Sequence, residues 1–444
     1  MTTSRGSTPR ASCPWTARPA GSTRGPIHAG EQSRIRFEGG ERSYVVAPSS
    51  RGESLSVVHL PPLVEATGEL TSEEVARYSR HLIIPDVGTD GQKRLRNARV
   101  LVVGAGGLGS PALLYLAAAG IGTLGIVEFD DVELSNLQRQ VIHGRSDVGR
   151  PKADSARDSI LELNDGVSVV LHRVRLDSSN AIDLFGNYDL VLDGTDNFAT
   201  RYLVNDAAAL VGIPYVWGSI YRFEGQVSVF WDAAPGGVGI NYRDLYPEAP
   251  PPGMVPSCAE GGVLGVLCAS TGSVMVTEAI KLITGIGETL LGRLMIYDAL
   301  AMSYRTVGLA RDPHRTPITE LIDYDAFCGV VPAVESDDAS ISPEQLRAML
   351  DSGREVALID VREPVEWDIV RIEGARLIPR GRILSGAALA ELPQQVPIVL
   401  YCKTGIRSAE VLDALVGAGF TDATHLDGGI VEWAKQIEPG LPIY

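Results

Sequence analysis

The chain has 444 residues, of which 45% are apolar and 21% are charged, and this composition suits two or three domains with full hydrophobic cores. Its formal net charge of −16 argues against a general nucleic-acid binder and against a protein of anionic membrane surfaces. The five cysteines form no regular framework, and they favour a reducing, cytoplasmic setting over a disulfide-stabilised secreted protein.

Residues 1–68 are predicted to be a disordered N-terminal extension. Residues 1–56 are rich in Ser, Gly, Pro and Arg and contain few side chains from which a core can form. Such a composition also occurs in transit peptides, but four glutamates interrupt it and neither an amphipathic helix nor an apolar signal segment is evident. We therefore favour a start site assigned too far upstream, with translation beginning near Val57.

Strands alternate with helices between residues 69 and 327. Thr71 and Glu74 have the spacing of a helix capping box. Residues 100–127 contain no charged side chain, but glycines divide them into short pieces, as in a buried strand–turn–helix–strand unit. The alternation predicts an α/β fold with a Rossmann-like, doubly wound, mostly parallel sheet. The expected strands are 99–103, 124–129, 190–193, 214–217 and 227–231, and the expected helices are 109–119, 152–163 and 197–210.

A second, smaller α/β domain is predicted over residues 342–444. Residues 328–341 are small, acidic and without clear periodicity, which indicates a linker. Pro343 stands at the first position of a predicted helix. Strands are expected at 356–360 and 398–401, with a helix at 407–416.

A glycine motif lies between the strand that ends at Val103 and the helix that follows it. Its glycines are Gly104, Gly106, Gly107 and Gly109. Such glycines let the backbone approach a phosphate, and the helix N-terminus supplies N–H groups and a positive dipole end. The motif alone also fits a dehydrogenase, in which Glu128 would hold the ribose of NAD.

Three polar residues beyond the motif favour ATP over NAD. Arg139 and Lys152 suit a triphosphate whose departing pyrophosphate must be neutralised. Asp196 follows a predicted strand and suits Mg²⁺, although it can equally cap the next helix. Each residue alone is ordinary, and their joint occurrence after a glycine loop carries the argument.

Residues 69–325 resemble the MoeB/ThiF branch of the ubiquitin-activating-enzyme superfamily. The resemblance rests on ARYSRHLI (76–83), GAGGLG (104–109), SNLQRQ (135–140), GTDN (194–197) and a stretch that contains Cys258. It implies that an ATP-binding homodimer adenylates the C-terminal glycine of a ubiquitin-like sulfur carrier protein ending in Gly-Gly.

The family's site residues are carried over where this sequence matches its motifs. By resemblance, Arg80 reaches the phosphates from the partner subunit, and Glu128 replaces the usual ribose-binding aspartate with the same charge. Asn136, Arg139 and Lys152 match phosphate-contacting residues, and Asp196 matches the acid associated with Mg²⁺.

The chain departs from the family at the place of its structural zinc. Many members carry two C-x-x-C pairs, but residues 241–244 and 312–315 of this chain contain no cysteine. Because tetrahedral zinc needs four thiolate or imidazole ligands, we predict no zinc and expect packing to stabilise the region.

Cys402 is predicted to be a reactive thiol. It ends an apolar strand and is followed by Lys403, Thr404, Gly405, Ile406 and Arg407, after which a helix begins. Backbone N–H groups at a helix N-terminus, with adjacent cations, favour the thiolate and can hold a persulfide anion. The alternative is a buried structural cysteine.

Residues 340–444 resemble the rhodanese family. The resemblance rests on LIDVRE (358–363), Trp367, the loop 402–407, DGGI (427–430) and Trp433. Rhodaneses pass sulfane sulfur through a cysteine persulfide, so a donor such as thiosulfate or a cysteine desulfurase is implied. The five-residue loop Lys403–Arg407 fits sulfur, whereas related phosphatases have a longer cysteine loop.

Cys258 matches by resemblance a second reactive cysteine of the MoeB/ThiF branch. It lies in a loop of small residues and is expected to release the thiocarboxylate or to hold the carrier covalently, unless it is merely structural. Cys268 is expected in the core, and Cys13 and Cys328 lack a positive neighbourhood.

The combination resembles fused adenylyltransferase–sulfurtransferases of the MoeZ type. It predicts ATP-dependent adenylation of a carrier and sulfur transfer from a Cys402 persulfide. The carrier's pathway, whether molybdopterin, thiamine, cysteine or specialised-metabolite synthesis, is left open. The alternatives are a scaffold that binds carriers without catalysis, and an NAD-dependent oxidoreductase.

Overall fold

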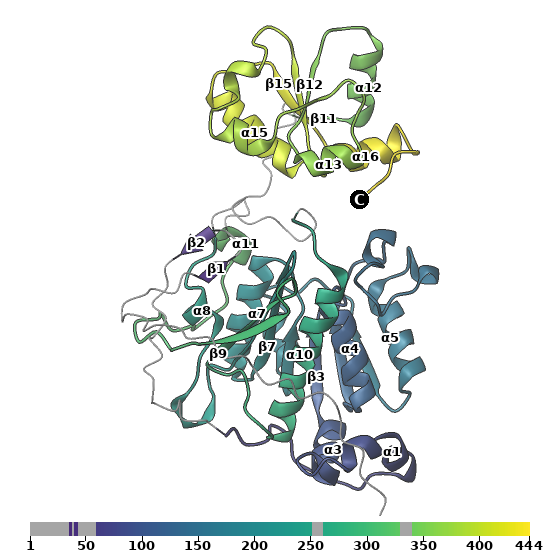
Figure 1. Ribbon diagram of the computed structural model, residues 1–444, viewed down its shortest axis with the longest axis vertical. Coiled ribbons are helices and arrows are strands. Elements are labelled where there is room, and N and C mark those ends of the chain that lie inside the picture. The colour runs from purple at the N-terminus through teal and green to yellow at the C-terminus, as the bar shows by residue number, and fades with distance from the viewer. Residues whose placement is uncertain (1–34, 38–39, 43–58, 251–260, 329–339) are drawn as a thin grey trace, which may run out of the picture. The chain divides into compact units, whose positions relative to one another are not determined.

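The computed structural model describes residues 35–37, 40–42, 59–250, 261–328 and 340–444 (Figure 1). The chain divides into two compact units, Met1–Cys328 and Gly329–Tyr444, called here the first and second units. This division falls within the linker predicted from the sequence.

The first unit begins earlier than the sequence predicts. Within the extension expected to be disordered, strands β1 (Ile35–Phe37) and β2 (Gly40–Arg42) pair in antiparallel fashion. Leu60 is 8% exposed and packs into the core, and the Leu63 N–H donates to the carbonyl of Leu282 at 3.1 Å. The expected boundary at residue 68 is therefore wrong for residues 59–68, because their apolar side chains are part of the first unit's core.

An eight-stranded sheet forms the centre of the first unit, in the order β10-β9-β8-β7-β6-β3-β4-β5. The five strands from β5 to β7 are parallel, as predicted, whereas β8, β9 and β10 are antiparallel. The turns from β7 to β8 and from β9 to β10 are too short for a crossover helix, so these strands form hairpins. The strands are β3 (Arg99–Val103), β4 (Thr123–Val127), β5 (Ser168–His172), β6 (Leu190–Asp193), β7 (Tyr215–Tyr221), β8 (Glu224–Phe230), β9 (Arg293–Asp298) and β10 (Ser303–Gly308).

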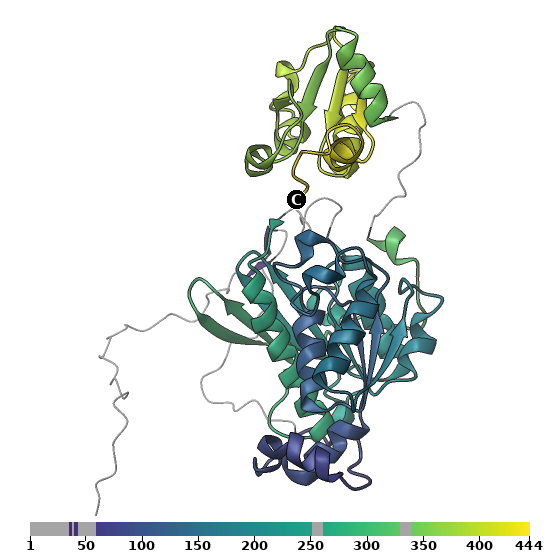
Figure 2. The same ribbon diagram turned by 90° about the vertical axis from the view of Figure 1, so that its right-hand side faces the viewer.

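Helices cover both faces of this sheet (Figures 1 and 2). Alternate residues of β3 point to opposite faces, so Val100 and Val102 join one core cluster while Leu101 and Val103 join the other. The first cluster includes side chains of α3, α4, α5 and α10, and the second includes side chains of α6, α7, α8 and α11. The helices are α1 (Ser72–Arg77), α2 (Ser79–Leu82), α3 (Gly88–Asn97), α4 (Gly109–Ala119), α5 (Lys152–Leu163), α6 (Ala181–Phe185), α7 (Phe198–Val211), α8 (Tyr242–Leu245), α10 (Gly265–Thr284) and α11 (Tyr324–Phe327), with 3₁₀ turns η1 (Leu134–Asn136), η2 (Arg145–Asp147) and η3 (Pro235–Gly237).

Two local predictions hold in detail. Thr71 caps α1 in a capping box with Glu74. Helix α4 ends at Gly120, whose φ of 81° is left-handed, and residues 100–127 form the buried β3–α4–β4 unit. Among the described residues, α10 is the one helix whose length and apolar composition would suit a bilayer, but its Leu267, Met275 and Leu282 are buried in the first unit's core.

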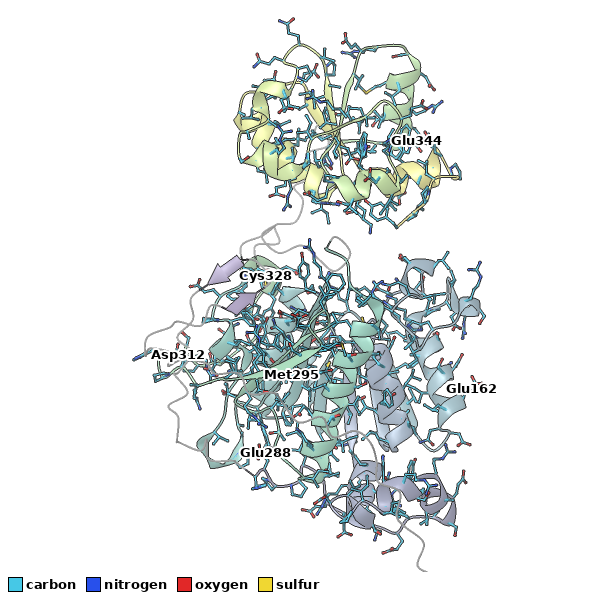
Figure 3. The ribbon with its side chains drawn as sticks, viewed as in Figure 1. Glu162, Glu288, Met295, Asp312, Cys328 and Glu344 are labelled. Atoms are coloured by element: carbon cyan, nitrogen blue, oxygen red, sulfur yellow. The ribbon has the colours of Figure 1, made fainter. Side chains whose placement is uncertain are left out.

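The second unit is a five-stranded parallel sheet in the order β11-β15-β14-β12-β13, with a core cluster on each face. Ser340 and Ile341 belong to β11, and Cys328, labelled in Figure 3, is 8% exposed at the end of α11. The predicted linker 328–341 is therefore too long at both ends, and its residues 329–339 lie outside the described part. The elements are β11 (Ser340–Ile341), α12 (Pro343–Asp351), β12 (Ala357–Asp360), α13 (Pro364–Ile369), β13 (Arg376–Leu377), α14 (Arg380–Leu384), η4 (Leu389–Glu391), β14 (Ile398–Tyr401), α15 (Ile406–Gly417), β15 (Ala423–Leu426) and α16 (Gly429–Gln436).

Candidate active sites

A cavity of about 330 Å³ opens in the first unit at the carboxyl ends of β3, β4 and β6. Ligands of open α/β sheets bind at this edge. Of the residues that the sequence predicted for ATP, the cavity is lined by Gly104, Gly106, Gly107, Glu128, Arg139, Lys152 and Asp196. Residues far apart in the chain thus meet at one pocket.

The glycines of the loop have different structural roles. Gly104 has a left-handed φ of 90°, which side chains rarely adopt. A Cβ on Gly109 would lie 1.9 Å from the carbonyl oxygen of Gly104, so Gly109 lets α4 pack closely on β3 and does not line the cavity. A Cβ on Gly107 would lie 3.0 Å from the Sγ of Cys268, which is 1% exposed in the core, where the sequence analysis expected it.

Glu128 follows β4 and is 7% exposed. One carboxylate oxygen accepts the Ala105 N–H at 2.9 Å, and the other accepts the N–H groups of Phe129 and Asp130 at 2.9 and 3.0 Å. These three donors hold the carboxylate between the glycine loop and the cavity, where its remaining lone pairs suit ribose hydroxyls.

Lys152 and Arg139 bring cationic groups to the cavity wall. Lys152 is the first residue of α5 and is 7% exposed, and its Nζ lies 3.1 Å from Asp130 Oδ2. The Arg139 guanidinium donates to the carbonyl of Ser135 at 3.3 Å. Two cations beside a glycine loop suit the phosphates of ATP.

Asp196 is exposed at the cavity edge, between β6 and α7. The sequence left open whether it caps the next helix. The structure gives that role to Asn197, whose side chain accepts the Thr200 N–H at 2.9 Å. Asp196 is not that cap, and its carboxylate has the oxygen ligands that Mg²⁺ prefers.

Gln140 and Arg201 are among the cavity residues to which the sequence analysis gave no role. Gln140 is 4% exposed, and its Oε1 has no hydrogen-bond partner among the described residues, so the cavity presents a buried acceptor to a ligand. Arg201 is 4% exposed, and its guanidinium lies 5.3 Å from the ring centre of Phe198 and 5.8 Å from that of Trp217. Gln140 stands inside the SNLQRQ motif, which was the available signal. The glycine loop and the cations suit the phosphates of ATP and Glu128 suits its ribose, so the residues that line the cavity are compatible with ATP.

Besides Gly109, two residues predicted for the nucleotide do not line this cavity. Asn136 is 7% exposed, and its Oδ1 accepts the Glu133 N–H at 3.0 Å, so it shapes the turn before Arg139. Arg80 is exposed on α2, which packs with α1 and α3 at the opposite end of β3 from Gly104. Within one chain Arg80 is not brought to the cavity.

Ion pairs join the two segments, around residues 241–244 and 312–315, where the sequence analysis found no cysteine pairs. Arg315 pairs with Asp232 and, at 2.5 Å, with Asp244, whose side chain is fully buried. Asp244 also accepts the N–H groups of Asn241 and of Asp312, the latter labelled in Figure 3, at 2.8 and 3.0 Å. No group of three His, Cys, Asp or Glu side chains suited to a metal occurs in the described ranges.

The second unit places Cys402 directly after β14, in the loop that leads to α15. Its Sγ accepts the Gly405 N–H at 3.2 Å and lies 3.6 Å from the hydroxyl of Ser408. Gly405 has a left-handed φ of 96°, and the loop closes against the carbonyl of Cys402, which accepts the Ile430 N–H at 2.9 Å. Cys402 is 1% exposed, and its sulfur lies between the Gly405 N–H and the Ser408 hydroxyl.

The rest of the predicted persulfide loop divides between exposed and buried side chains. Thr404 and Ile406 are exposed, Ile406 at 78%. The Lys403 ammonium lies 4.7 Å from the ring centre of Tyr444. Arg407 is 9% exposed and pairs with Glu366 through two contacts of 2.8 Å. Its guanidinium is thus engaged by a carboxylate, which the sequence analysis did not anticipate.

Cys258 lies outside the described residues, as does Cys13. Burial raises the pKa of Cys328 to about 11, and the charge of Asp325 adds to this effect. Cys328 is therefore a protonated core cysteine at neutral pH.

Comparison with known proteins gives two family matches. The model of the ThiF family matches residues 78–317, and that of the rhodanese-like domain matches residues 342–436. The two matches fall on separate units of the structure.

Three curated relatives are similar over most of their own length. The probable adenylyltransferase/sulfurtransferase MoeZ of Mycobacterium tuberculosis is 70% identical over 388 residues, which cover 87% of this chain and 99% of that protein. The sulfur carrier protein adenylyltransferase of Thermus thermophilus is 53% identical over 59% of this chain and 98% of its own. The adenylyltransferase and sulfurtransferase MOCS3 of Drosophila grimshawi is 40% identical over 85% of this chain and 87% of its own.

Proposed function

The chain belongs to the ThiF family and joins an adenylyltransferase unit to a rhodanese-like sulfurtransferase unit, and on this premise we propose that its substrates are ubiquitin-like sulfur carrier proteins ending in Gly-Gly. One relative is named as acting on a sulfur carrier protein, which supports this substrate class. The relatives are named as transferases, so an NAD-dependent oxidoreductase and a catalytically silent scaffold both lose support.

The first step is adenylation in the cavity of the first unit. ATP lies with its phosphates over the glycine loop and its ribose at Glu128. The carrier's terminal carboxylate attacks the α-phosphorus, an acyl–phosphate bond forms, and pyrophosphate leaves. Arg139 and Lys152 neutralise the charge that develops on the departing pyrophosphate. Mg²⁺, held at Asp196, would screen the phosphate oxygens.

The second step is sulfur transfer from Cys402. The Cys402 sulfur first attacks the outer sulfur of the donor, the donor's S–S bond breaks, and sulfite leaves from thiosulfate or a thiolate leaves from a donor persulfide. The product is a Cys402 persulfide held by the Gly405 N–H and the neighbouring loop. The terminal sulfur attacks the acyl carbon, a C–S bond forms and AMP leaves. An acyl disulfide between carrier and Cys402 remains.

A thiol completes the cycle. Its attack on the sulfur of Cys402 releases the carrier thiocarboxylate and leaves a disulfide between that thiol and Cys402. Two further thiols, or one dithiol, reduce this disulfide and are themselves oxidised to a disulfide. We propose Cys258 as the attacking group, with covalent capture of the carrier as its alternative role. Thiosulfate or a cysteine desulfurase serves as the donor, in a cytoplasmic homodimer in which Arg80 serves the partner's cavity.

The main observation in support of this proposal is that one chain contains two candidate sites. One is the glycine-loop cavity lined by Arg139, Lys152 and Asp196, and the other is the loop around Cys402. The test is intact-mass spectrometry of a Gly-Gly carrier incubated with the protein, Mg-ATP and thiosulfate. Exchange of one oxygen for one sulfur supports both steps. Adenylation without sulfur would refute the second step, and an unchanged mass with each of several Gly-Gly carriers would refute the proposal.

A further inference from the structure

His143 is buried in the first unit, where it is 5% exposed. Its ring lies between the glycine loop and helix α5. One ring nitrogen, Nε2, lies 3.1 Å from the carbonyl oxygen of Ala105 in the loop. The other, Nδ1, lies 2.8 Å from the hydroxyl of Ser155 on α5. The side chain does not line the cavity, and the sequence analysis gave it no role.

The carbonyl partner fixes the protonation of one ring nitrogen. A carbonyl oxygen only accepts, so Nε2 carries the hydrogen and donates to Ala105. Nδ1 of the neutral ring then accepts from the Ser155 hydroxyl. Burial lowers the pKa of His143 and the charge of Lys152 lowers it further, although the Ala105 carbonyl and Asp147 oppose the shift. The neutral tautomer with hydrogen on Nε2 is therefore the resting form.

The held carbonyl determines where the next N–H points. The Ala105 C=O and the Gly106 N–H belong to one planar, trans peptide and point in opposite directions. His143 and the Ser110 hydroxyl, at 3.2 Å, both hold the carbonyl, while Gly106 lines the cavity. Fixing the carbonyl therefore keeps the Gly106 N–H on the opposite side of the peptide.

Without this hold the peptide would be free to rotate. Gly106 and Gly107 accept a wide range of backbone angles, and a Cβ on Gly106 would meet nothing closer than 3.7 Å. The preceding peptide is fixed separately, because the Ala105 N–H donates to Glu128. His143, together with the Ser110 hydroxyl, thus restrains the Ala105–Gly106 peptide.

The same side chain connects the loop to a phosphate-site cation. Ser155 stands three residues after Lys152 on α5, so His143 ties the loop to the first turn of that helix. The charged groups that act on the ring are Lys152 and Asp147, and Asp147 is itself paired with Arg150.

We propose that His143 is a positioning residue that aims the Gly106 N–H at the phosphates of ATP and ties the glycine loop to the helix that carries Lys152. The inference rests on the proposed function, since it assumes that the cavity binds ATP. A histidine that only fills the core would leave nucleotide affinity unchanged when a side chain of similar size replaces it.

The test compares His143→Leu with His143→Gln in the full chain, by calorimetric titration with Mg-ATP alone. Leucine removes both hydrogen bonds of the His143 ring, so the Gly106 N–H is no longer held towards the phosphates. We expect the Kd for Mg-ATP to rise roughly tenfold, which is the effect of losing one well-placed hydrogen bond between protein and ligand. Glutamine can donate to Ala105 and accept from Ser155, and we expect its Kd to stay within about threefold of the wild type. Hydrogen exchange of peptides covering residues 104–110, measured without ATP, should accelerate in the leucine variant only.

His172→Gln is the matched control, since His172 is half-buried with a partner, Tyr188 at 2.7 Å, but does not line the cavity. Wild-type affinity in His143→Leu, or equal losses in His143→Leu and His143→Gln, would overturn the inference. If His143→Leu does not fold, Ser155→Ala takes its place, and an unchanged Kd and exchange rate there would count against the positioning role. Failure of the wild type to bind Mg-ATP would instead refute the proposed function.

Discussion

Arg407 and Glu366 form a bidentate ion pair, with both nitrogen–oxygen distances at 2.8 Å and both side chains almost fully buried. Arg407 belongs to α15, which follows the Cys402 loop, and Glu366 belongs to α13. The Tyr444 hydroxyl donates to the same carboxylate at 2.8 Å. The pair therefore connects α15, the helix that follows the reactive thiol, to α13.

Glu366→Gln should destabilise the second unit in a pH-dependent way. Burial alone would raise the pKa of Glu366, but hydrogen bonds from Arg407 and from the Glu363 N–H lower it to about 2. A depressed pKa means that the ionised form stabilises the fold. This contribution is complete above the usual glutamate pKa, roughly 4.3, and is lost as the pH falls towards 2. We expect the variant to lose roughly 3 kcal/mol at pH 7.

Scanning calorimetry of the full chain between pH 7 and pH 3 checks this expectation. The difference between variant and wild type should narrow as the pH falls below roughly 4.3. Glu373→Gln is the control, because Glu373 is an exposed carboxylate of the same unit. A difference that is the same at every pH would mean that the ionised pair is not the source of the stability.

Cys402→Ala should separate the two half-reactions. The substitution removes the only sulfur in the loop and leaves the first unit untouched, so ATP–pyrophosphate exchange with a carrier should persist at the wild-type rate. Thiosulfate:cyanide sulfur transfer should fall to background, since no thiolate remains to accept the sulfur. Cys328→Ala, in the other unit, is the control. Thiocarboxylate formation at the wild-type rate in Cys402→Ala would exclude this residue as the donor.

Local patterns predicted the elements that position both sites. The strand before Gly104 and the helix that begins at Gly109 carry their signals within a few neighbouring residues, and the structure reproduces both. The same holds for the strand that ends at Tyr401. Strand-to-helix turns are recognisable because glycine, apolar runs and helix caps act over short distances.

Local sequence patterns could not predict contacts between residues that are far apart in the chain. Glu366 and Arg407 are 41 positions apart, and Ala105 and His143 are 38 apart. The sequence therefore presented Arg407 as a cation beside the thiol, whereas the fold turns its guanidinium to a carboxylate. Strands β9 and β10 and most of α10 were also missed. In α10, Gly265, Gly272 and several Ser and Thr residues weaken the helical pattern, and burial against the sheet outweighs that preference.

Arg139→Ala should impair adenylation without affecting sulfur transfer. Arg139 lines the first unit's cavity, and its loss removes positive charge from the place where we propose that pyrophosphate departs. We expect ATP–pyrophosphate exchange to fall by roughly 10²-fold or more, as for removal of one charge-stabilising donor. Thiosulfate:cyanide transfer should remain at the wild-type rate. Arg311→Ala, at an exposed position of the same unit, should leave both activities intact, and equal loss of both activities in Arg139→Ala would indicate misfolding instead.

Arg315→Met should destabilise the first unit and leave the second unit's transition unchanged. The substitution leaves the fully buried side chain of Asp244 without its cation, and removal of one partner from a buried pair costs roughly 3–5 kcal/mol. Thermal unfolding followed by calorimetry measures the loss, with Arg305→Met, an exposed arginine on β10, as the control. We predict no zinc in this region, so incubation with a strong chelator in the absence of ATP should leave the wild-type transition where it was. A lower transition after chelation, restored by added zinc, would show that metal rather than the Arg315 ion pairs holds the two segments together.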